Sequence, residues 1–214
     1  MIKAVLWDFG GVITTSPFEA FNRFEAENSL PRDIIRSINA TNPHTNAWAR
    51  LESSQISVAE FDDAFAEEAR AIGHDISGQA VLSLLSGDLR PRMVEALKTI
   101  KGHYKNGCIT NNISNQGEGP GMARDGERAS RFAEVMDLFD VVIESSKIGI
   151  RKPNPAIYKI ACEQMNISPE DAVFLDDLGI NLKPARELGM KTIKVLDADQ
   201  ALTELGEHLN MEFG

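Results

Sequence analysis

Residues 2–12 read IKAVLWDFGGV, an apolar run that ends abruptly at an acid, an aromatic residue and two glycines. The run at 2–7 is short and rich in branched or aromatic side chains, which favours a buried strand over a helix. Asp8 is the first polar residue after that strand. Because ligands bind beyond the carboxyl ends of strands in parallel sheets, Asp8 is the first candidate for a functional side chain.

Four more short apolar runs predict buried strands, at 107–110, 141–143, 172–175 and 192–196. Helical patterns separate the later runs. Within 132–139, for instance, apolar residues stand at i, i+3, i+4 and i+7, the spacing of one helix face. Strands that alternate with helices are typical of a doubly wound parallel sheet, so we expect an α/β fold.

The stretch 16–87 breaks this alternation, because it carries helix-like patterns and no convincing strand. The simplest interpretation is a helical cap inserted after the first strand, over a core formed by 1–15 and 88–214. The glycine-rich, charged segment 114–130 predicts a surface loop, since its glycines do not keep the spacing of a dinucleotide-binding motif.

The 214 residues carry a formal net charge of −10 and 43% hydrophobic content, which suits a globular protein with a full core. A negative field of this size repels nucleic acids and anionic membranes, so neither is an expected partner. A small anionic substrate can bind only where local cations or a metal make the electrostatic potential positive. No run approaches the roughly 18 apolar residues of a membrane span, the N-terminal run is too short for a signal peptide, and the two cysteines predict buried, reduced thiols. These features favour a cytoplasmic protein and leave its oligomeric state undetermined.

Polar residues follow several of the predicted strands. They are Asp8 after the first strand, Thr110, Asn111 and Asn112 after the second, Asp176 and Asp177 after the fourth, and Lys152 in a loop that opens a helix. Each is ordinary by itself, as a turn former, a loop residue or a solvated side chain. Adjacent carboxylates, however, repel each other unless a cation or donors intervene. Together, at one edge of a parallel sheet, these residues predict an active site.

Two longer stretches carry a family resemblance: ESSKIGIRKPNPAIY at 144–158 and VFLDDLGINLKPAR at 173–186. With the order of the short motifs, they resemble the haloacid dehalogenase-like hydrolase superfamily over nearly the whole chain. Within it, the chain is most similar to the phosphatase domain found at the N-terminus of soluble epoxide hydrolases, and to bacterial single-domain relatives. The resemblance implies a Rossmann-like core with an inserted cap, a Mg²⁺ cofactor and a hydrolase that acts through a covalent aspartyl intermediate.

The resemblance also implies metal ligands. Asp8 would be both the nucleophile and a magnesium ligand, because a carboxylate has two oxygens. Asp177 matches the metal-binding acid of the family, and Gly10 would offer its backbone carbonyl to the metal. Asp176 would be a second ligand through water, or a positioning group.

The remaining residues are implied to bind the transferred group. The Thr110 hydroxyl and the Asn111 backbone N–H would hold a phosphoryl oxygen, and Lys152 would offset negative charge in a partly dry site. Asn181 is expected to support the ligands rather than to bind the metal.

Gly10 departs from the family pattern, because the usual phosphatase has a second Asp two residues after the nucleophile. That acid protonates the leaving group, and general acid–base catalysis contributes about a hundred- to ten-thousand-fold. Three hypotheses stay open. The favoured one is a phosphatase of a small phosphorylated metabolite, with a good leaving group or a proton from elsewhere. The others are a metal-independent 2-haloacid dehalogenase, which needs no acid, and a non-catalytic member that binds a phosphorylated ligand or a partner protein.

One cap segment, 39–48, is polar and contains the large aromatic Trp48. It could reach the active site, but we favour a polar loop between helices that Trp48 anchors in the cap core. Substrate choice would be made in the cap, because the cap closes over Asp8.

Overall fold

The computed structural model describes residues 1–113 and 126–213. Its centre is a five-stranded parallel sheet in the order β3-β2-β1-β4-β5. The strands are β1 (Ala4–Trp7), β2 (Lys105–Thr110), β3 (Val141–Glu144), β4 (Ala172–Asp176) and β5 (Lys191–Lys194). The chain builds outward from β1 to β3 on one side and from β4 to β5 on the other, which confirms the predicted doubly wound sheet.

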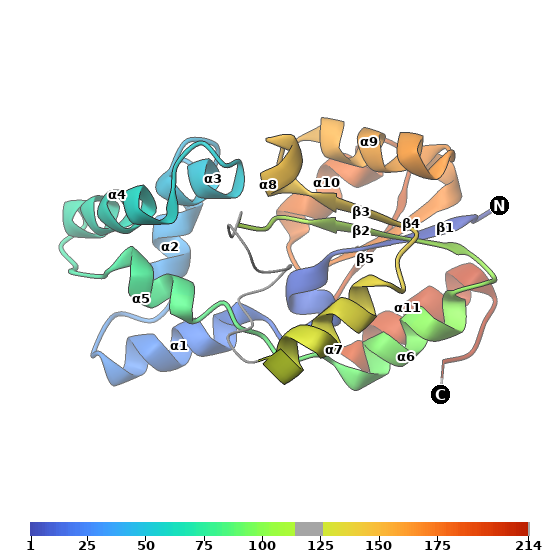
Figure 1. The fold of residues 1–214 in the computed structure, drawn as a ribbon, viewed down its shortest axis with the longest axis horizontal. Coiled ribbons are helices and arrows are strands. Elements are labelled where there is room, and N and C mark those ends of the chain that lie inside the picture. Colours follow the sequence, from blue (N-terminus) through green and yellow to red (C-terminus); the bar gives the residue numbers. More distant parts are fainter. Residues whose placement is uncertain (114–125, 214) are drawn as a thin grey trace.

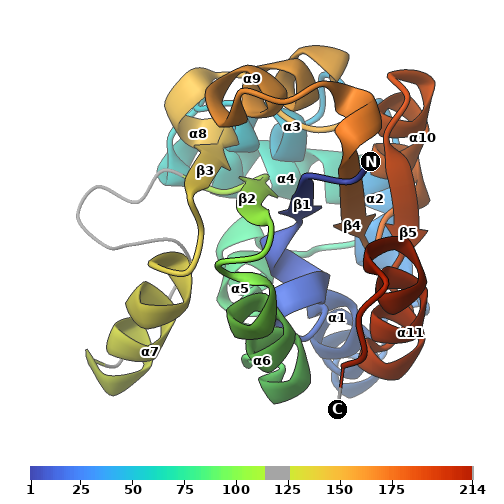
Figure 2. The same ribbon diagram turned by 90° about the vertical axis from the view of Figure 1, so that its right-hand side faces the viewer.

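Helices cover both faces of the sheet (Figures 1 and 2). One face carries α6 (Pro91–Ile100), α7 (Gly126–Met136) and α11 (Ala198–Leu209), and the other carries α9 (Pro155–Met165) and α10 (Gly179–Glu187). The short α8 (Ser145–Ile148) follows β3 directly. Successive residues of a strand point to opposite faces. Accordingly, Val5 and Trp7 of β1 pack in the first core and Ala4 and Leu6 in the second.

After a π-helical turn, η1 (Phe9–Ile13), five α-helices form a separate unit: α1 (Pro17–Glu27), α2 (Ile34–Ala40), α3 (Ala47–Glu52), α4 (Val58–Ala71) and α5 (Gly78–Ser83). This unit has its own buried core, which includes Phe21, Ile35, Phe61 and Phe65. In Figure 1 it lies beyond the carboxyl ends of the strands. An isolated antiparallel bridge between Thr14 and Leu89 joins the two connecting segments.

Several predicted element bounds are corrected. The helix α7 begins at Gly126, so the loop prediction is wrong for 126–130, and the rest of that loop (114–125) lies outside the described residues. The apolar face of this helix packs on the core through Phe132 and Val135, which outweighs the polar composition of its first turn. Strand β2 begins at Lys105, two residues before the predicted run.

The early start of β2 depends on hydrogen bonds that its polar residues make. Asn106 is fully buried; Trp7 Nε1 donates to its side-chain oxygen (3.1 Å), and its amide donates to the carbonyl of Leu97 (3.2 Å). Lys105 Nζ donates to the carbonyl of Met165 (2.6 Å). A buried polar residue with its hydrogen bonds satisfied fits a strand that hydropathy alone does not predict.

Both cysteines, Cys108 and Cys162, are buried and free. Among the helices of the described residues, none has the length and apolar character needed to cross a membrane.

Candidate active site

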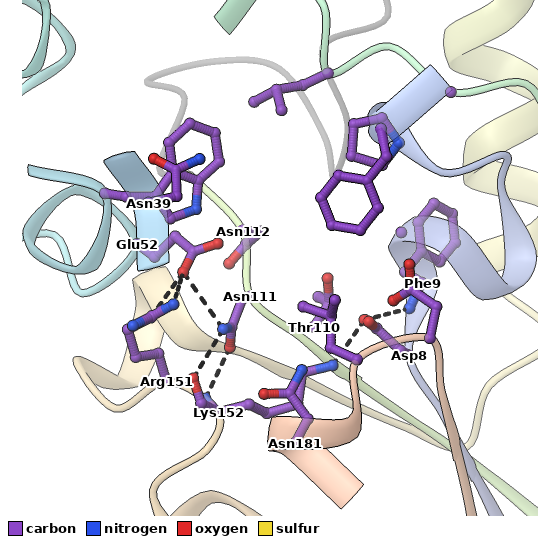
Figure 3. A pocket seen from close by; sticks show the side chains of 18 of the residues that line it. Asp8, Phe9, Asn39, Glu52, Thr110, Asn111, Asn112, Arg151, Lys152 and Asn181 are labelled. Atoms are coloured by element: carbon purple, nitrogen blue, oxygen red, sulfur yellow. Dashed lines mark hydrogen bonds and ion pairs between the residues drawn. The ribbon is translucent and has the colours of Figure 1, made fainter. Parts of the chain in front are cut away.

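Asp8 and Lys152 form a buried ion pair at the carboxyl edge of the sheet (Figure 3). Asp8 follows β1, and its backbone N–H donates to the carbonyl of Leu175 on β4 (2.8 Å). Its side chain accepts a hydrogen bond from the N–H of Phe9 (2.7 Å), which fixes the carboxylate at the start of the next turn. Lys152 Nζ lies 2.8 Å from Asp8 Oδ1, and the lysine is 1% exposed. The candidate nucleophile therefore faces a fixed cation.

Asp176 holds Lys152 in place from the end of β4. It is fully buried, and it accepts a hydrogen bond from Lys152 Nζ (2.7 Å). It also accepts from the N–H of Leu178 (2.8 Å) and from the side-chain amide of Asn181 (3.0 and 3.1 Å). These hydrogen bonds engage both oxygens of the carboxylate. They favour a positioning role for Asp176 over direct metal ligation.

Asp177 lies directly against Gly11, the second of the two glycines that follow Phe9. Gly11 has a φ of +80°, and a Cβ at this position would lie 2.3 Å from Asp177 Oδ2. Ser16 Oγ donates to the same carboxylate oxygen at 3.4 Å. At Gly10, by contrast, no atom lies within 4 Å of the position a Cβ would take. Packing therefore requires a glycine at position 11 and does not require one at position 10.

One carboxylate oxygen from each of Asp8, Asp176 and Asp177 lies within 4.8 Å of the other two. Three carboxylates face one ammonium, so the fully ionised cluster has a formal charge of −2. Burial raises the pKa of Asp8 against the effect of Lys152, and Asp176 and Asp177 raise it further. Burial and the charge of Asp176 likewise raise the pKa of Asp177 to about 6.

Lys152 responds to the same excess of negative charge. Burial alone would lower its pKa, but the attraction of Asp176 and Asp8 outweighs burial and raises that pKa above its ordinary value. We therefore take the lysine as charged. The raised pKa of Asp8 fits this assignment, because a single ammonium shared by two carboxylates leaves negative charge uncompensated. A divalent cation would balance it.

Thr110 and Asn111, at the end of β2, lie in the same pocket as Asp8. Thr110 is buried and lines the pocket that contains Asp8. The side chain of Asn111 pairs with the backbone of Lys152: the lysine N–H donates to Asn111 Oδ1 (2.8 Å), and Asn111 Nδ2 donates to the lysine carbonyl (3.0 Å). Only the backbone N–H of Asn111 was predicted to have a role, so this positioning role of its side chain was missed.

A pocket of about 510 Å³ lies between the sheet edge and the helical unit. Gly10 and Asp177 line it together with Asp8, Thr110, Asn111 and Lys152, so the structure brings these predicted site residues together. Asp176, fully buried beneath Lys152, is not part of the lining. Much of the remaining lining is aromatic or aliphatic and comes from both units: Phe9, Phe18, Phe21, Trp48, Leu85 and Phe132.

An ion pair ties the helical unit to the core beside this pocket. Arg151 Nε and Nη2 each lie 2.7 Å from Oε2 of Glu52, the last residue of α3. Asn111 Nδ2 donates to the same oxygen (3.3 Å). Arg151 Nη1 also donates to the carbonyl of Pro43 (2.8 Å), and Ser145 Oγ donates to the carbonyl of Glu52 (2.8 Å). The helical unit is thus held by the residue that precedes the buried lysine.

The segment 39–48 reaches the pocket through Asn39, Ala40, Pro43 and Trp48. It is not a single loop, because Asn39 belongs to α2 and Trp48 to α3. Trp48 also packs edge-on against Phe61, with 5.5 Å between ring centroids, so it anchors the segment in the helical core as well.

Residues 2–189 match the sequence model of one protein family, described as haloacid dehalogenase-like hydrolase. The chain belongs to this family. This hydrolase is 31% identical to bifunctional epoxide hydrolase 2 of Sus scrofa over 95% of its own length, and it spans 38% of that longer protein. It is 26% identical to a sesquiterpene phosphatase of Aspergillus oryzae, with 95% of this chain and 94% of that protein covered.

Solved structures agree with the fold. A haloacid dehalogenase family enzyme from Bacteroides thetaiotaomicron, in complex with magnesium and inorganic phosphate, superposes on the hydrolase with a TM-score of 0.62. The two are 22% identical, and the match covers 96% of this chain and 99% of the other. At this identity the likeness extends to the fold alone.

Glu52 is one of the pocket residues that the sequence did not predict, and Arg36 is another. An acid at the end of an amphipathic helix is most often solvated, and nothing in the sequence pairs it with Arg151, 99 residues away. Asn39 had a weak signal, since it begins the polar segment that was considered able to reach the site.

Proposed function

We propose that this hydrolase is a phosphatase that cleaves a phosphate monoester through a covalent aspartyl-phosphate on Asp8. The observation that carries the proposal is the buried pair of Asp8 and Lys152, 2.8 Å apart, in a pocket that Asp177 also lines. A carboxylate held beside a fixed cation is arranged to attack an anionic centre without repelling it. Family membership and phosphatase relatives support the same reaction.

The donor set fits Mg²⁺, which prefers one or two protein carboxylates with substrate oxygens and water. Asp8, Asp177 and the backbone carbonyl of Gly10 would hold the ion, and the formal charge of −2 on the cluster suits a divalent cation. When bound, Mg²⁺ supplies positive charge to the phosphoryl oxygens and to the carboxylates that surround it.

Each residue of the site then has its own role in the reaction. An oxygen of Asp8 attacks phosphorus, and the bond from phosphorus to the ester oxygen breaks as the new bond forms. The Lys152 ammonium, the Thr110 hydroxyl and the Asn111 N–H stabilise the charge on the phosphoryl oxygens. Water next attacks phosphorus, which frees Asp8 and releases inorganic phosphate. Because Gly10 has no side chain, the departing oxygen takes its proton from solvent.

The aromatic lining points to a substrate whose body is apolar. Phe18, Trp48 and Phe132 present rings to the pocket, and burying an apolar chain against them contributes about 25 cal/mol per Å². The similarity to a sesquiterpene phosphatase supports an apolar body. In this proposal residues 16–87 act as a cap that excludes water from Asp8, and the Glu52–Arg151 pair holds it against the core.

Gly10 favours a second candidate, a 2-haloacid dehalogenase. A halide leaves without a proton, so a missing acid costs that reaction nothing. The dehalogenase would release halide from 2-haloacids without a metal, whereas a member that only binds its ligand would turn over neither substrate class.

The deciding experiment measures phosphate release from p-nitrophenyl phosphate, with and without Mg²⁺, for the wild type and for Asp8→Asn. Magnesium-dependent turnover that is lost in Asp8→Asn is the expected result. Metal-independent halide release, with no phosphate release, would replace the phosphatase by the dehalogenase. If the protein turns over neither phosphate esters nor 2-haloacids, the hypothesis of a non-catalytic, ligand-binding member remains.

A further inference from the structure

We infer that Glu52 is a positioning residue, which acts from the helical unit on the backbone of Lys152 and so keeps the lysine ammonium in its place beside Asp8. The inference deepens the proposed function and rests on it for the role of Lys152 in the reaction. It goes beyond the attachment of the helical unit, because it makes the placement of a core residue depend on that unit.

Three donors converge on one oxygen of Glu52. Arg151 Nε and Nη2 each lie 2.7 Å from Oε2, and Asn111 Nδ2 donates to the same atom at 3.3 Å (Figure 3). Both partners belong to the core, whereas Glu52 is the last residue of α3 in the helical unit. A single carboxylate oxygen thus joins the helical unit to two separate segments of the core.

Both of these segments contact the backbone of Lys152. Arg151 precedes the lysine in the chain. Asn111 meets it from the end of β2: the lysine N–H donates to Asn111 Oδ1 (2.8 Å), and Asn111 Nδ2 donates to the lysine carbonyl (3.0 Å). Asn111 Nδ2 is therefore shared between the lysine carbonyl and Glu52. If the amide turned over, its oxygen would face the Glu52 carboxylate, so Glu52 favours the orientation that binds Lys152.

The lysine is held at both of its ends, by different parts of the molecule. Asp8 and Asp176 fix the ammonium at 2.8 and 2.7 Å, and both acids belong to the core. The backbone of Lys152 depends on Arg151 and Asn111, and through them on Glu52. A misplacement of about 1 Å in an active site can cost about a hundredfold in rate. A shift of this backbone would therefore be felt at the ammonium.

Glu52 is itself fixed well enough to serve as an anchor. It is 7% exposed, and its carbonyl accepts a hydrogen bond from Ser145 Oγ (2.8 Å). Hydrogen bonds between ionised groups, such as those from Arg151, are about twice as strong as neutral ones. If the helical unit moved away, Arg151 and Asn111 would lose this acceptor together. The site thus has its cation fully supported only while the helical unit is docked.

Ser54 offers a matched control, because it joins the same two parts of the molecule without contacting the Lys152 backbone. Its Oγ donates to the carbonyl of Ser146 in α8 (2.9 Å), and the residue is exposed. Ser54→Ala removes one attachment of the helical unit and leaves the three donors on Glu52 in place. The comparison of Ser54→Ala with Glu52→Gln therefore separates attachment from positioning.

The first test measures hydrogen exchange of the Lys152 backbone N–H by NMR, because this N–H donates to Asn111. In Glu52→Gln we expect its protection to fall about tenfold, as for the loss of one hydrogen bond to a charged group. Ser54→Ala should keep the wild-type protection. Unchanged protection in Glu52→Gln, or an equal loss in both variants, would overturn the inference.

The second test measures the kinetics of p-nitrophenyl phosphate hydrolysis with Mg²⁺. Glu52→Gln should lower kcat about tenfold and change KM less, because the disturbed ammonium stabilises charge in the transition state. Ser54→Ala should keep the wild-type kcat. In an active enzyme, a wild-type kcat for Glu52→Gln would show that the reaction does not depend on this support of Lys152.

Glu52→Asp covers the case in which Glu52→Gln does not fold. It keeps the negative charge, but its side chain is one methylene shorter, so its carboxylate cannot meet all three donors. Protection of the Lys152 N–H and kcat should both fall. Wild-type values of both would contradict the positioning role.

Hydrogen exchange needs no turnover, so it separates this inference from the proposed function. If the wild type releases no phosphate from p-nitrophenyl phosphate, the phosphatase proposal fails, while a loss of protection confined to Glu52→Gln still supports the positioning of Lys152. An active phosphatase whose Lys152 N–H is equally protected in the wild type and in Glu52→Gln would reject the inference alone.

Discussion

Lys152 Nζ lies 2.8 Å from Asp8 Oδ1 and is enclosed by the protein, with 1% of the lysine exposed. A second carboxylate, Asp176, holds the same ammonium from the other side at 2.7 Å. The lysine therefore serves two purposes. It places a positive charge beside the candidate nucleophile, and it keeps two buried carboxylates from facing each other without compensation.

Replacing Lys152 by Met should destabilise the fold and abolish phosphatase activity. Removing one partner of a buried ion pair leaves an uncompensated charge, which costs about 3–5 kcal/mol. Urea unfolding monitored by circular dichroism would measure the loss. Lys159→Met, at an exposed position of α9, is the control and should change stability little. A wild-type unfolding midpoint in Lys152→Met would show that the pair does not hold the site together.

Gly11→Ala should weaken magnesium binding, because a Cβ there would lie 2.3 Å from Asp177 Oδ2 and must displace that carboxylate. We expect the Mg²⁺ concentration for half-maximal activity to rise about tenfold or more, the effect of disturbing the surroundings of a metal ligand. Gly73→Ala is a matched control: its φ of +87° imposes similar backbone strain, and no atom lies within 4 Å of the new Cβ. Half-maximal activity at the same Mg²⁺ concentration in both variants would show that the contact of Gly11 with Asp177 does not support metal binding.

Gly10→Asp should raise activity on esters with poor leaving groups. The position has room for a side chain, and its φ of −71° suits any residue. A carboxylic acid there would protonate the departing oxygen, so alkyl phosphates should gain about a hundredfold while p-nitrophenyl phosphate gains little. Steady-state kinetics of both esters would measure this. Gly10→Asn, similar in size without the acid, should gain nothing; an equal gain in both variants would point to a cause other than proton transfer.

The two thiols should be inert in the folded protein. Burial raises the pKa of Cys162 to about 11, and burial together with the charge of Asp8 raises the pKa of Cys108 still further above its ordinary value. The thiolate is the reactive form, so at pH 8 little of either thiol is ionised. Ellman's reagent should titrate both cysteines only after denaturant is added. Rapid labelling of the native protein would contradict the burial of these residues.

Much of the fold followed from local patterns in the sequence. Short apolar runs with helical periodicity between them predicted the parallel sheet, because a strand buried on both faces must be apolar throughout. The topology of such a sheet then places the strand ends at one edge, which is why the sequence alone predicts that Asp8, Thr110 and Asp177 lie together. The prediction was wrong at 126–130, where packing of the following helix overrides a polar first turn.

The tertiary structure alone decided how the site is supported and how it is shaped. Three interactions join segments that are far apart in the chain. They are the two hydrogen bonds between the Asn111 side chain and the Lys152 backbone, the close approach of Gly11 to Asp177, and the ion pair of Glu52 with Arg151. Sequence patterns report which face of an element is buried, because periodicity is a local property. Which polar atom meets which depends on how the elements pack, and that geometry exists only once the chain has folded.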